Sequence, residues 1–338
     1  MFATTNSGQI LTFPVNLAGG GLGAPTSIAG PANAAGLATV FAVLPTRLNL
    51  YVSDPQAGAI RVYTLSSTLG STLSPASVGP YPLGTGNGTP GEMALGNALY
   101  VATSVGSIAA FNMNADGSLT SVPGSPFAAG TGPSHLAAVS SQTVANTSFL
   151  YASNAGDANG SISAFKMTSS GALVPVPGSP FSTVSGGGPA GFYTFGENLY
   201  VALQNANAVA AFAIADDGSL TPLPGSPFPA GRGTFSLNGA SGFLLATNNL
   251  DGTISSYSID PQSGVLTEVA GSPFPGAVTS GDTVYSNGRL FVPDASSNNI
   301  MGFQFDSTGA VSSLMGSPFQ AGAGPVALTA GQFPGFDP

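Results

Sequence analysis

The chain has 338 residues with 48 Gly, 28 Pro, no Cys and no Trp, and 14 Asp and Glu against 5 Lys and Arg give it a net charge of −9. This charge argues against nucleic acid and anionic membranes as partners, because both are bound through clustered Lys and Arg. The lack of Cys excludes disulfides and thiolate metal sites, whereas 43 % apolar residues suffice for a sizeable core.

Two short patterns recur seven times along the chain and predict its strands. The first is an apolar strand: Met1-Phe2-Ala3, Leu50-Tyr51-Val52, Leu99-Tyr100-Val101, Leu150-Tyr151-Ala152, Leu199-Tyr200-Val201, Leu244-Leu245-Ala246 and Leu290-Phe291-Val292. The second is an Ile or Val followed three residues later by an aromatic residue: Ile10/Phe13, Ile60/Tyr63, Ile108/Phe111, Ile162/Phe165, Val209/Phe212, Ile254/Tyr257 and Ile300/Phe303. Residues i and i+3 of a strand face opposite sides of a sheet. Each sheet is therefore expected to pack between two others, and seven copies predict seven sheets.

A third pattern, Gly-Ser-Pro-Phe, fixes the period of the repeat. It starts at Gly124, Gly178, Gly225, Gly271 and Gly316, in steps of 54, 47, 46 and 45 residues. Periods of about 40 to 50 residues are typical of propeller blades. We expect the Phe of each copy to fill the space between blades and the Pro to fix the bend before it.

One repeat can be divided into four strands. They are expected at Pro133 to Ser140, Phe149 to Ser153, Ser161 to Met167 and Leu173 to Val176, and Asp- and Gly-containing turns of the hairpin type join the third to the fourth. The longest apolar run, Ala208 to Ala215, is far shorter than the ~18 residues that a membrane helix needs. No membrane span is predicted.

The two ends of the chain are expected to share one blade. The chain starts on a second strand and ends on a first strand at Gly324-Pro-Val-Ala-Leu-Thr-Ala, so its C-terminal strand would close the ring and remove the exposed edge. The Gly- and Ala-rich stretch from Gly19 to Ala38 is expected to be the weakest part of this first blade. The sequence thus predicts an all-β fold, one seven-bladed β-propeller domain over residues 1–338 with four-stranded antiparallel blades.

These strands and the Gly-Ser-Pro-Phe linker resemble the lactonase-like seven-bladed β-propellers with YVTN-type repeats, which include 6-phosphogluconolactonase and the 3-carboxymuconate cyclases. Gly132-Pro-Ser-His-Leu-Ala followed by Leu150-Tyr-Ala-Ser-Asn-Ala is similar to the family signature Gly-Pro-Arg-His-Leu-Ala and Leu-Tyr-Val-x-Asn-Glu. The resemblance implies that the Arg and Glu of this signature bind or process substrate in active members. In this chain Ser134 stands in place of the Arg and Ala155 in place of the Glu, whereas the His is kept as His135.

A small polar site at the channel mouth is the functional hypothesis that the inner strands offer. Aligning their starts places seven residues at equivalent positions: Thr39, Glu92, His135, Gly191, Ser236, Asp282 and Ala327. His135 would act as general base or ligand and Arg232 as a clamp for a carboxylate, with Glu92 as the third catalytic candidate. Asp282, Ser236 and Ser134 are the candidates for ligand binding. The alternative is that polar residues simply line a wet channel.

Other chemistry is not favoured by the sequence. The remaining basic residues, Arg47, Arg61, Lys166 and Arg289, fall on turns of the opposite face or in third strands, so a phosphorylated sugar lactone lacks its usual cations. One His in the whole chain leaves no Ser-His-Asp array. Four second-to-third loops carry Asp at positions 54, 157, 251 and 294, for which turn chemistry is favoured over calcium. We expect no metal and no cofactor.

The loss of the family Arg and Glu favours an exported binding or scaffold propeller without enzyme activity. Its partner would be an unknown small molecule, a glycan or a protein. The alternative is a divergent lactone hydrolase or muconate cyclase-like enzyme that uses His135, Glu92 and Arg232. A surface or assembly protein is a third interpretation. Scarce Lys and a composition rich in Ser, Thr, Gly, Ala and Asn favour an extracytoplasmic location, periplasmic or secreted.

Overall fold

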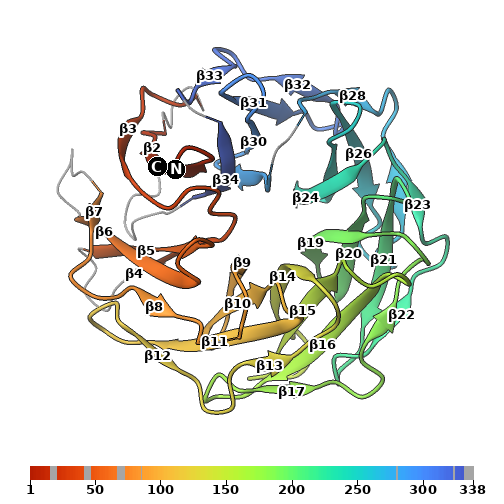
Figure 1. The fold of residues 1–338 in the computed structure, drawn as a ribbon. Coiled ribbons are helices and arrows are strands. Elements are labelled where there is room, and N and C mark those ends of the chain that lie inside the picture. Colours follow the sequence, from red (N-terminus) through yellow and green to blue (C-terminus); the bar gives the residue numbers. More distant parts are fainter. Residues whose placement is uncertain are drawn as a thin grey trace.

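Seven antiparallel sheets form a ring in the computed structural model, which describes residues 1–15, 21–41, 47–66, 73–84, 86–278, 281–322 and 324–330 (Figure 1). The all-β seven-bladed propeller predicted from the repeats is confirmed. In the described parts of the chain there is no helix that is long and apolar enough to cross a bilayer.

We number the blades 1 to 7 and give the strands in that order, from the centre of the ring outwards. The innermost strands are β34 (Pro325–Thr329), β4 (Leu37–Phe41), β9 (Pro90–Leu95), β14 (Pro133–Ser140), β19 (Pro189–Phe195), β24 (Thr234–Ala240) and β29 (Val284–Ser286). The second strands are β1 (Phe2–Thr5), β5 (Arg47–Asp54), β10 (Leu99–Thr103), β15 (Ser148–Asn154), β20 (Asn198–Leu203), β25 (Phe243–Asn248) and β30 (Arg289–Asp294).

The third strands are about as long as the second ones, whereas the fourth strands, at the rim, are short. The third strands are β2 (Gln9–Thr12), β6 (Ala59–Ser66), β11 (Ser107–Met113), β16 (Ser161–Met167), β21 (Ala208–Ile214), β26 (Thr253–Ile259) and β31 (Asn299–Phe305). The fourth strands are β3 (Thr26–Ala29), β7 (Ser74–Pro75), β12 (Leu119–Ser121), β17 (Leu173–Pro175), β22 (Leu220–Pro222), β27 (Leu266–Glu268) and β32 (Val311–Ser313).

The two ends of the chain meet in blade 1, as predicted. Strand β34 pairs antiparallel with β1, with Thr329 opposite Phe2 and Ala327 opposite Thr4, and the pairing covers the inner edge of β1. Within the Gly- and Ala-rich stretch, residues 19 and 20 lie outside the described residues, and the remainder forms β3 and leads into β4.

Six blades carry a fifth, very short strand that the sequence analysis did not predict. These strands pair with the third strand, next to the end of the fourth: β8 (Tyr81–Pro82), β13 (Phe127–Ala128), β18 (Phe181–Ser182), β23 (Phe228–Pro229), β28 (Phe274–Pro275) and β33 (Phe319–Gln320). In five of them the Gly-Ser-Pro-Phe segment leads into the strand. Its Phe packs against a core cluster shared by neighbouring blades, as Phe127 and Phe181 do, so its expected role between blades is confirmed.

The Ser of this segment completes the hydrogen bonding of the third strand. In blade 3 the carbonyl of Ala110 accepts from Val122 N–H at the end of the fourth strand, and Ala110 N–H donates to Ser125 Oγ at 2.8 Å. The same bond joins a third-strand N–H to Ser179, Ser226, Ser272 and Ser317. Because buried backbone donors need a partner, the hydroxyl bridges the gap where the rim strand changes direction.

Buried hydroxyls also join successive blades from blade 2 to blade 7. The hydroxyls of Tyr51, Tyr100, Tyr151 and Tyr200 donate to the carbonyls of Gly117, Gly171, Gly218 and Gly264, each in the third-to-fourth turn of the following blade. Blade 6 has Leu245 in place of the Tyr, and Ser256, its neighbour across the strand pair, donates to Gly309 instead. These contacts set the spacing of blades 2 to 7 around the ring.

We predict that Tyr151→Phe lowers the free energy of unfolding by about 1 to 3 kcal/mol, because it leaves the Gly218 carbonyl buried without its donor. Urea unfolding followed by circular dichroism measures this value. Lys166→Ala, an exposed change on the neighbouring strand β16, should stay within about 0.5 kcal/mol of the wild type. Equal effects of the two changes would show that the hydroxyl does not join the blades.

Candidate active site

Most of the inner strands have a β-bulge near their start, and these bulges line the centre of the ring. In β34, β9, β14, β19 and β24 the register shifts so that two residues lie opposite one. In blade 4 these two are Ser134 and His135, opposite Ser153. A bulge bends the strand and re-aims a side chain, and Ser134 and His135 accordingly both line the central cavity although they are neighbours in sequence.

The first residues of the bulges, together with the corresponding residues of blades 2 and 7, form the wall of that cavity. Its volume is about 280 Å³, and six blades contribute one such residue each: Ala35, Ser134, Ala190, Phe235, Gly281 and Val326. Ser134 is the only polar side chain in this ring. The cavity is therefore a small, largely apolar chamber with room for one small ligand.

The second residues of the bulges include the titratable side chains of the cavity. These second positions are held by Ala327, Glu92, His135, Gly191 and Ser236, as aligned from the sequence, and Asp282 holds the same position in blade 7. The position expected for Thr39 is wrong: Leu37 pairs with Val52, so Gly36 is the equivalent residue. Gly36 fits where a side chain cannot, because a Cβ there would lie 2.1 Å from the carbonyl oxygen of Gly91.

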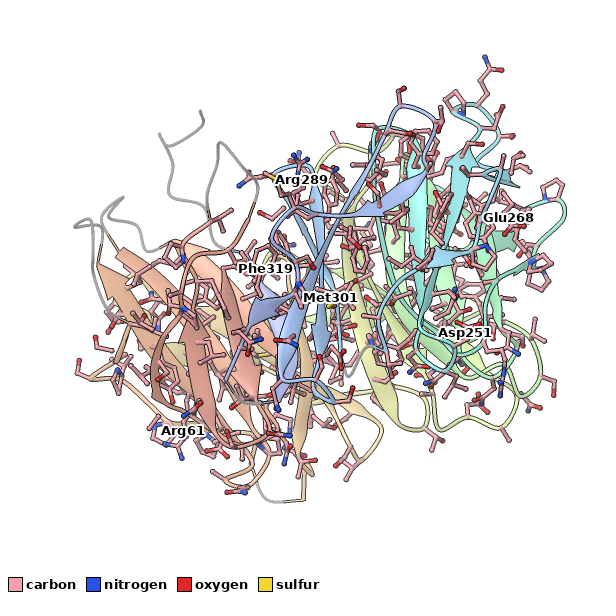
Figure 2. All side chains as sticks on the ribbon, turned by 90° about the horizontal axis from the view of Figure 1, so that it is seen from above. Arg61, Asp251, Glu268, Arg289, Met301 and Phe319 are labelled. Atoms are coloured by element: carbon pink, nitrogen blue, oxygen red, sulfur yellow. The ribbon has the colours of Figure 1, made fainter. Side chains whose placement is uncertain are left out.

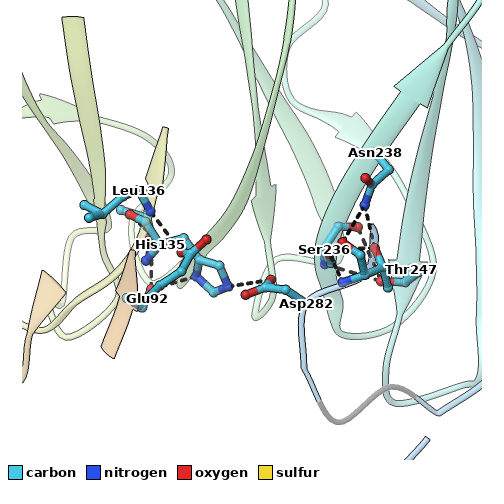
Figure 3. Close-up of polar contacts among 10 residues, drawn as sticks. Glu92, His135, Leu136, Ser236, Asn238, Thr247 and Asp282 are labelled. Atoms are coloured by element: carbon cyan, nitrogen blue, oxygen red, sulfur yellow. Dashed lines mark hydrogen bonds and ion pairs between the residues drawn. The ribbon is translucent and has the colours of Figure 1, made fainter. Parts of the chain in front are cut away.

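Glu92, His135 and Asp282 meet in the cavity from blades 3, 4 and 7 (Figure 3). His135 Nε2 lies 3.1 Å from Asp282 Oδ1, and Leu136 N–H donates to Glu92 Oε2 at 3.0 Å. The His135 side chain is 7 % exposed and that of Asp282 is 27 % exposed. The ring of His135 also packs edge-on against Phe235, with 5.2 Å between centroids.

The two carboxylates reverse the effect of burial on His135. Burial by itself lowers the pKa of an imidazole, but the negative charges of Asp282 and Glu92 and the hydrogen bond that the ring donates to Asp282 raise the pKa of His135 to about 9. Burial and the charge of Asp282 raise the pKa of Glu92 to about 8, against the opposing effects of His135 and the Leu136 N–H. Near neutral pH, His135 and Glu92 therefore each favour their protonated form.

Ser134 extends the contact between His135 and Asp282 into a continuous series of hydrogen bonds. Its Oγ lies 3.0 Å from His135 Nδ1 and 3.1 Å from Ser153 Oγ, and Ser153 Oγ accepts from His135 N–H at 3.0 Å. The sequence analysis excluded a Ser-His-Asp array, and this exclusion was wrong. Ser134, His135 and Asp282 form one, which spacing could not reveal because its members come from blades 4 and 7.

Two of the candidate residues lie apart from this group. Ser236 Oγ is 2.9 Å from Thr283 Oγ1, and with Asn238 and Thr247 it forms a separate network (Figure 3). Arg232 is exposed, its backbone N–H donates to Asp251, and it is not among the residues that line the cavity. Of the six candidates, the structure thus brings together Glu92, Ser134, His135 and Asp282.

The cluster also has the composition of a cation site. One ligand atom each from Glu92, His135 and Asp282 can be chosen so that all lie within 4.8 Å of one another, and divalent cations bind such carboxylate and imidazole groups. The sequence analysis expected no metal site, since no motif joins these residues. A bound cation would compete with the proton that His135 and Asp282 share.

The loop aspartates act in turns, as expected. Asp157, Asp251 and Asp294 each accept a hydrogen bond from the backbone N–H two residues further on, and Asp54 accepts from Ala57 N–H and pairs with Arg61. In an edge-on view, Arg289 lies on the upper face of the ring and Asp251 towards the lower one (Figure 2). The basic side chains that the structure describes are all absent from the cavity wall: Arg61, Lys166, Arg232 and Arg289.

Comparison with known proteins identifies the family. The model of the family "Lactonase, 7-bladed beta-propeller" matches residues 6–232 and, in a second match, residues 108–280. A candidate 6-phosphogluconolactonase of Bacteroides fragilis superposes with a TM-score of 0.78 and 20 % identity, over 96 % of each chain. The periplasmic gluconolactonase of Pseudomonas aeruginosa superposes with a TM-score of 0.74 and 20 % identity, also over 96 % of each chain. No curated protein sequence matches the chain.

We predict that the protein becomes less stable as the pH rises from 6 to 9.5. The raised pKa of His135 means that its stabilising contribution is complete below pH 6.5 and lost as the pH rises through about 9. The raised pKa of Glu92 acts in the same direction, because between about pH 4.5 and pH 8 the folded state keeps a proton that the unfolded chain has released. Thermal unfolding should show Tm falling by several degrees.

Glu92→Gln should make the fall of Tm with pH shallower. It removes the titration of Glu92, and without that negative charge the pKa of His135 is raised less. Glu268→Gln, an exposed change on β27, is the matched control and should follow the wild type. A wild-type Tm that is constant or rises over this pH range would contradict the raised pKa values.

Proposed function

The chain belongs to the family of seven-bladed lactonase β-propellers, and from this premise we propose that it is an enzyme that opens the ring of a small uncharged lactone. The observation that carries the proposal is the convergence of His135, Glu92 and Asp282 in one cavity at the centre of the ring. A propeller that served only as a scaffold would not need a buried cluster of titratable groups, which is costly to assemble.

The position of the cavity supports this proposal. Ser134 and Ala155, which stand where the family signature has Arg and Glu, both line it together with His135. The chain therefore lacks two polar groups of the signature at the place where two other blades contribute carboxylates. Glu92 comes from blade 3 and Asp282 from blade 7, so carboxylates remain available although Ala155 cannot provide one.

The charge of the cavity indicates the substrate class. None of the four basic side chains that the structure describes lines the wall, whereas a phosphate or several carboxylates would be held by Arg or Lys. We therefore favour an uncharged lactone over a phosphorylated sugar lactone or a muconate. A volume of about 280 Å³ suits a molecule about the size of one sugar ring.

His135 is the general base of the proposed reaction. Asp282 accepts the hydrogen bond from Nε2–H, so the neutral ring presents its lone pair at Nδ1. From there it removes the proton of the oxygen that attacks the lactone carbonyl, and then returns it to the ring oxygen that leaves. Asp282 orients the ring and stabilises its charged form. Glu92 contributes negative charge that makes His135 more basic.

The extracytoplasmic location inferred from composition is part of this proposal. The Pseudomonas aeruginosa protein of the same fold is named as periplasmic, and we propose the same kind of compartment for this chain. A binding role for a small molecule, glycan or protein is the competing function, and it predicts no turnover.

Hydrolysis of a panel of uncharged γ- and δ-lactones, with 6-phosphogluconolactone for comparison, tests the activity. We expect turnover of at least one uncharged lactone, and His135→Gln should reduce kcat/KM by about 10² to 10⁴. Arg232→Ala should stay within threefold, because Arg232 does not line the cavity, and EDTA should leave turnover unchanged. No turnover of any lactone would favour the binding role. Turnover lost with EDTA and restored by a divalent cation would assign the cluster to a metal.

The dependence of the rate on pH tests the role of His135. The groups that face it are Asp282 and Glu92, and a base that must first lose its proton gives a kcat/KM that rises up to about pH 9. Glu92→Gln removes a negative charge, so the rise should occur at lower pH. Subtracting the rate of His135→Gln at each pH corrects for spontaneous hydrolysis. A rise that stays in place or moves to higher pH would exclude this role of Glu92.

A further inference from the structure

We propose that Ser134 is the nucleophile of this site and forms a covalent acyl-enzyme with the opened lactone. This inference rests on the proposed function and names the oxygen that His135 activates. It follows from the two contacts of the imidazole: one nitrogen faces Asp282 at 3.1 Å and the other faces Ser134 Oγ at 3.0 Å.

The donors and acceptors of the series can be assigned in one consistent way. An ionised Asp282 only accepts, so neutral His135 carries its proton on Nε2 and accepts at Nδ1. Ser134 O–H then donates to Nδ1, and Ser153 O–H donates to Ser134 Oγ at 3.1 Å. His135 N–H closes the series by donating to Ser153 Oγ. The proton nearest to the base is therefore that of Ser134.

The fold does not require a hydroxyl at position 134. The same bulge forms with Ala190 in blade 5, Phe235 in blade 6 and Val326 in blade 1. In blades 2 and 6, Ser53 and Thr247 accept the backbone N–H of the second bulge residue as Ser153 does in blade 4. Ser153 is thus explained by the bulge, whereas the hydroxyl of Ser134, which the bulge does not require, contacts His135 and Ser153.

The surroundings suit acyl transfer. The other first residues of the bulges are apolar, and Phe235 packs against the imidazole, so the surroundings of Ser134 are largely apolar. The hydrogen bond from Ser153 stabilises the negative charge that develops on Ser134 Oγ. The same three groups recur on unrelated hydrolase folds, there with the roles of the two ring nitrogens exchanged.

The reaction balances without any further reactant except water. Ser134 Oγ attacks the carbonyl carbon, its proton passes to His135 Nδ1, and the bond from that carbon to the ring oxygen breaks. The proton then goes to the leaving oxygen, which becomes the free hydroxyl of an ester on Ser134. Water attacks this ester with His135 as base, and the hydroxy acid leaves as Ser134 regains its proton.

The test is labelling with a small dialkyl fluorophosphate, followed by intact-protein mass and peptide mapping. We expect one adduct on Ser134 in the wild type, at least 10²-fold slower labelling of His135→Gln, and none in Ser134→Ala. Ser140→Ala, an exposed change at the end of the same strand, is the matched control and should label like the wild type. Ser134→Ala should keep the wild-type Tm, since alanine occupies this place in blade 5, and should lose lactone turnover by at least 10²-fold.

Three outcomes separate the two proposals. Wild-type turnover with no adduct, retained within threefold by Ser134→Ala, would overturn the nucleophile and leave the lactonase, with water attacking directly. An adduct on Ser134 without turnover of any lactone would keep the nucleophile and overturn the lactonase. A wild type that neither labels nor turns over would overturn both.

Discussion

The contact between His135 and Asp282 joins two residues that are 147 positions apart in sequence and three blades apart in the ring. It can form only if all the inner strands between them are placed correctly, because an error in the spacing of one blade moves every following one. The hydroxyls of Tyr151, Tyr200 and Ser256 provide that spacing between blades 4 and 7. A contact of about 3 Å at the centre thus depends on bonds made well outside it.

The bulge in the inner strand brings two neighbouring side chains, Ser134 and His135, into the same cavity. A regular strand sends successive side chains to opposite faces, so it could not place Ser134 and His135 in the same cavity. The repeat provides the bulge in blade after blade, and most blades fill it with small or apolar residues. Three blades place Glu92, His135 and Asp282 there, and their mutual charges set the basicity of the imidazole. The scaffold is that of the family, and the chemistry of the cavity depends on these three side chains.

Much of the fold could be predicted from local patterns, because each strand carries its own apolar signature and each blade its own linker. The inner-strand alignment found Glu92, His135, Ser236 and Asp282, but it failed at Thr39, where Gly36 leaves no side-chain signal. Contacts across the ring could not be predicted. The sequence spacing of the repeats does not show how far each bulge projects into the channel. It therefore could not predict that His135 contacts both Asp282 and Ser134, or that Arg232 does not line the cavity.

His135 is the only histidine of the chain, so its ring nitrogens can be followed without assignment by ¹⁵N NMR of histidine-labelled protein. This measurement tests the central claim that Asp282 holds the imidazole as a strong base whose free nitrogen faces Ser134. The account predicts a pKa raised well above 6.5, a neutral form protonated at Nε2, and a lower pKa in Asp282→Asn. A pKa at or below 6.5, or a neutral form protonated at Nδ1, would contradict it.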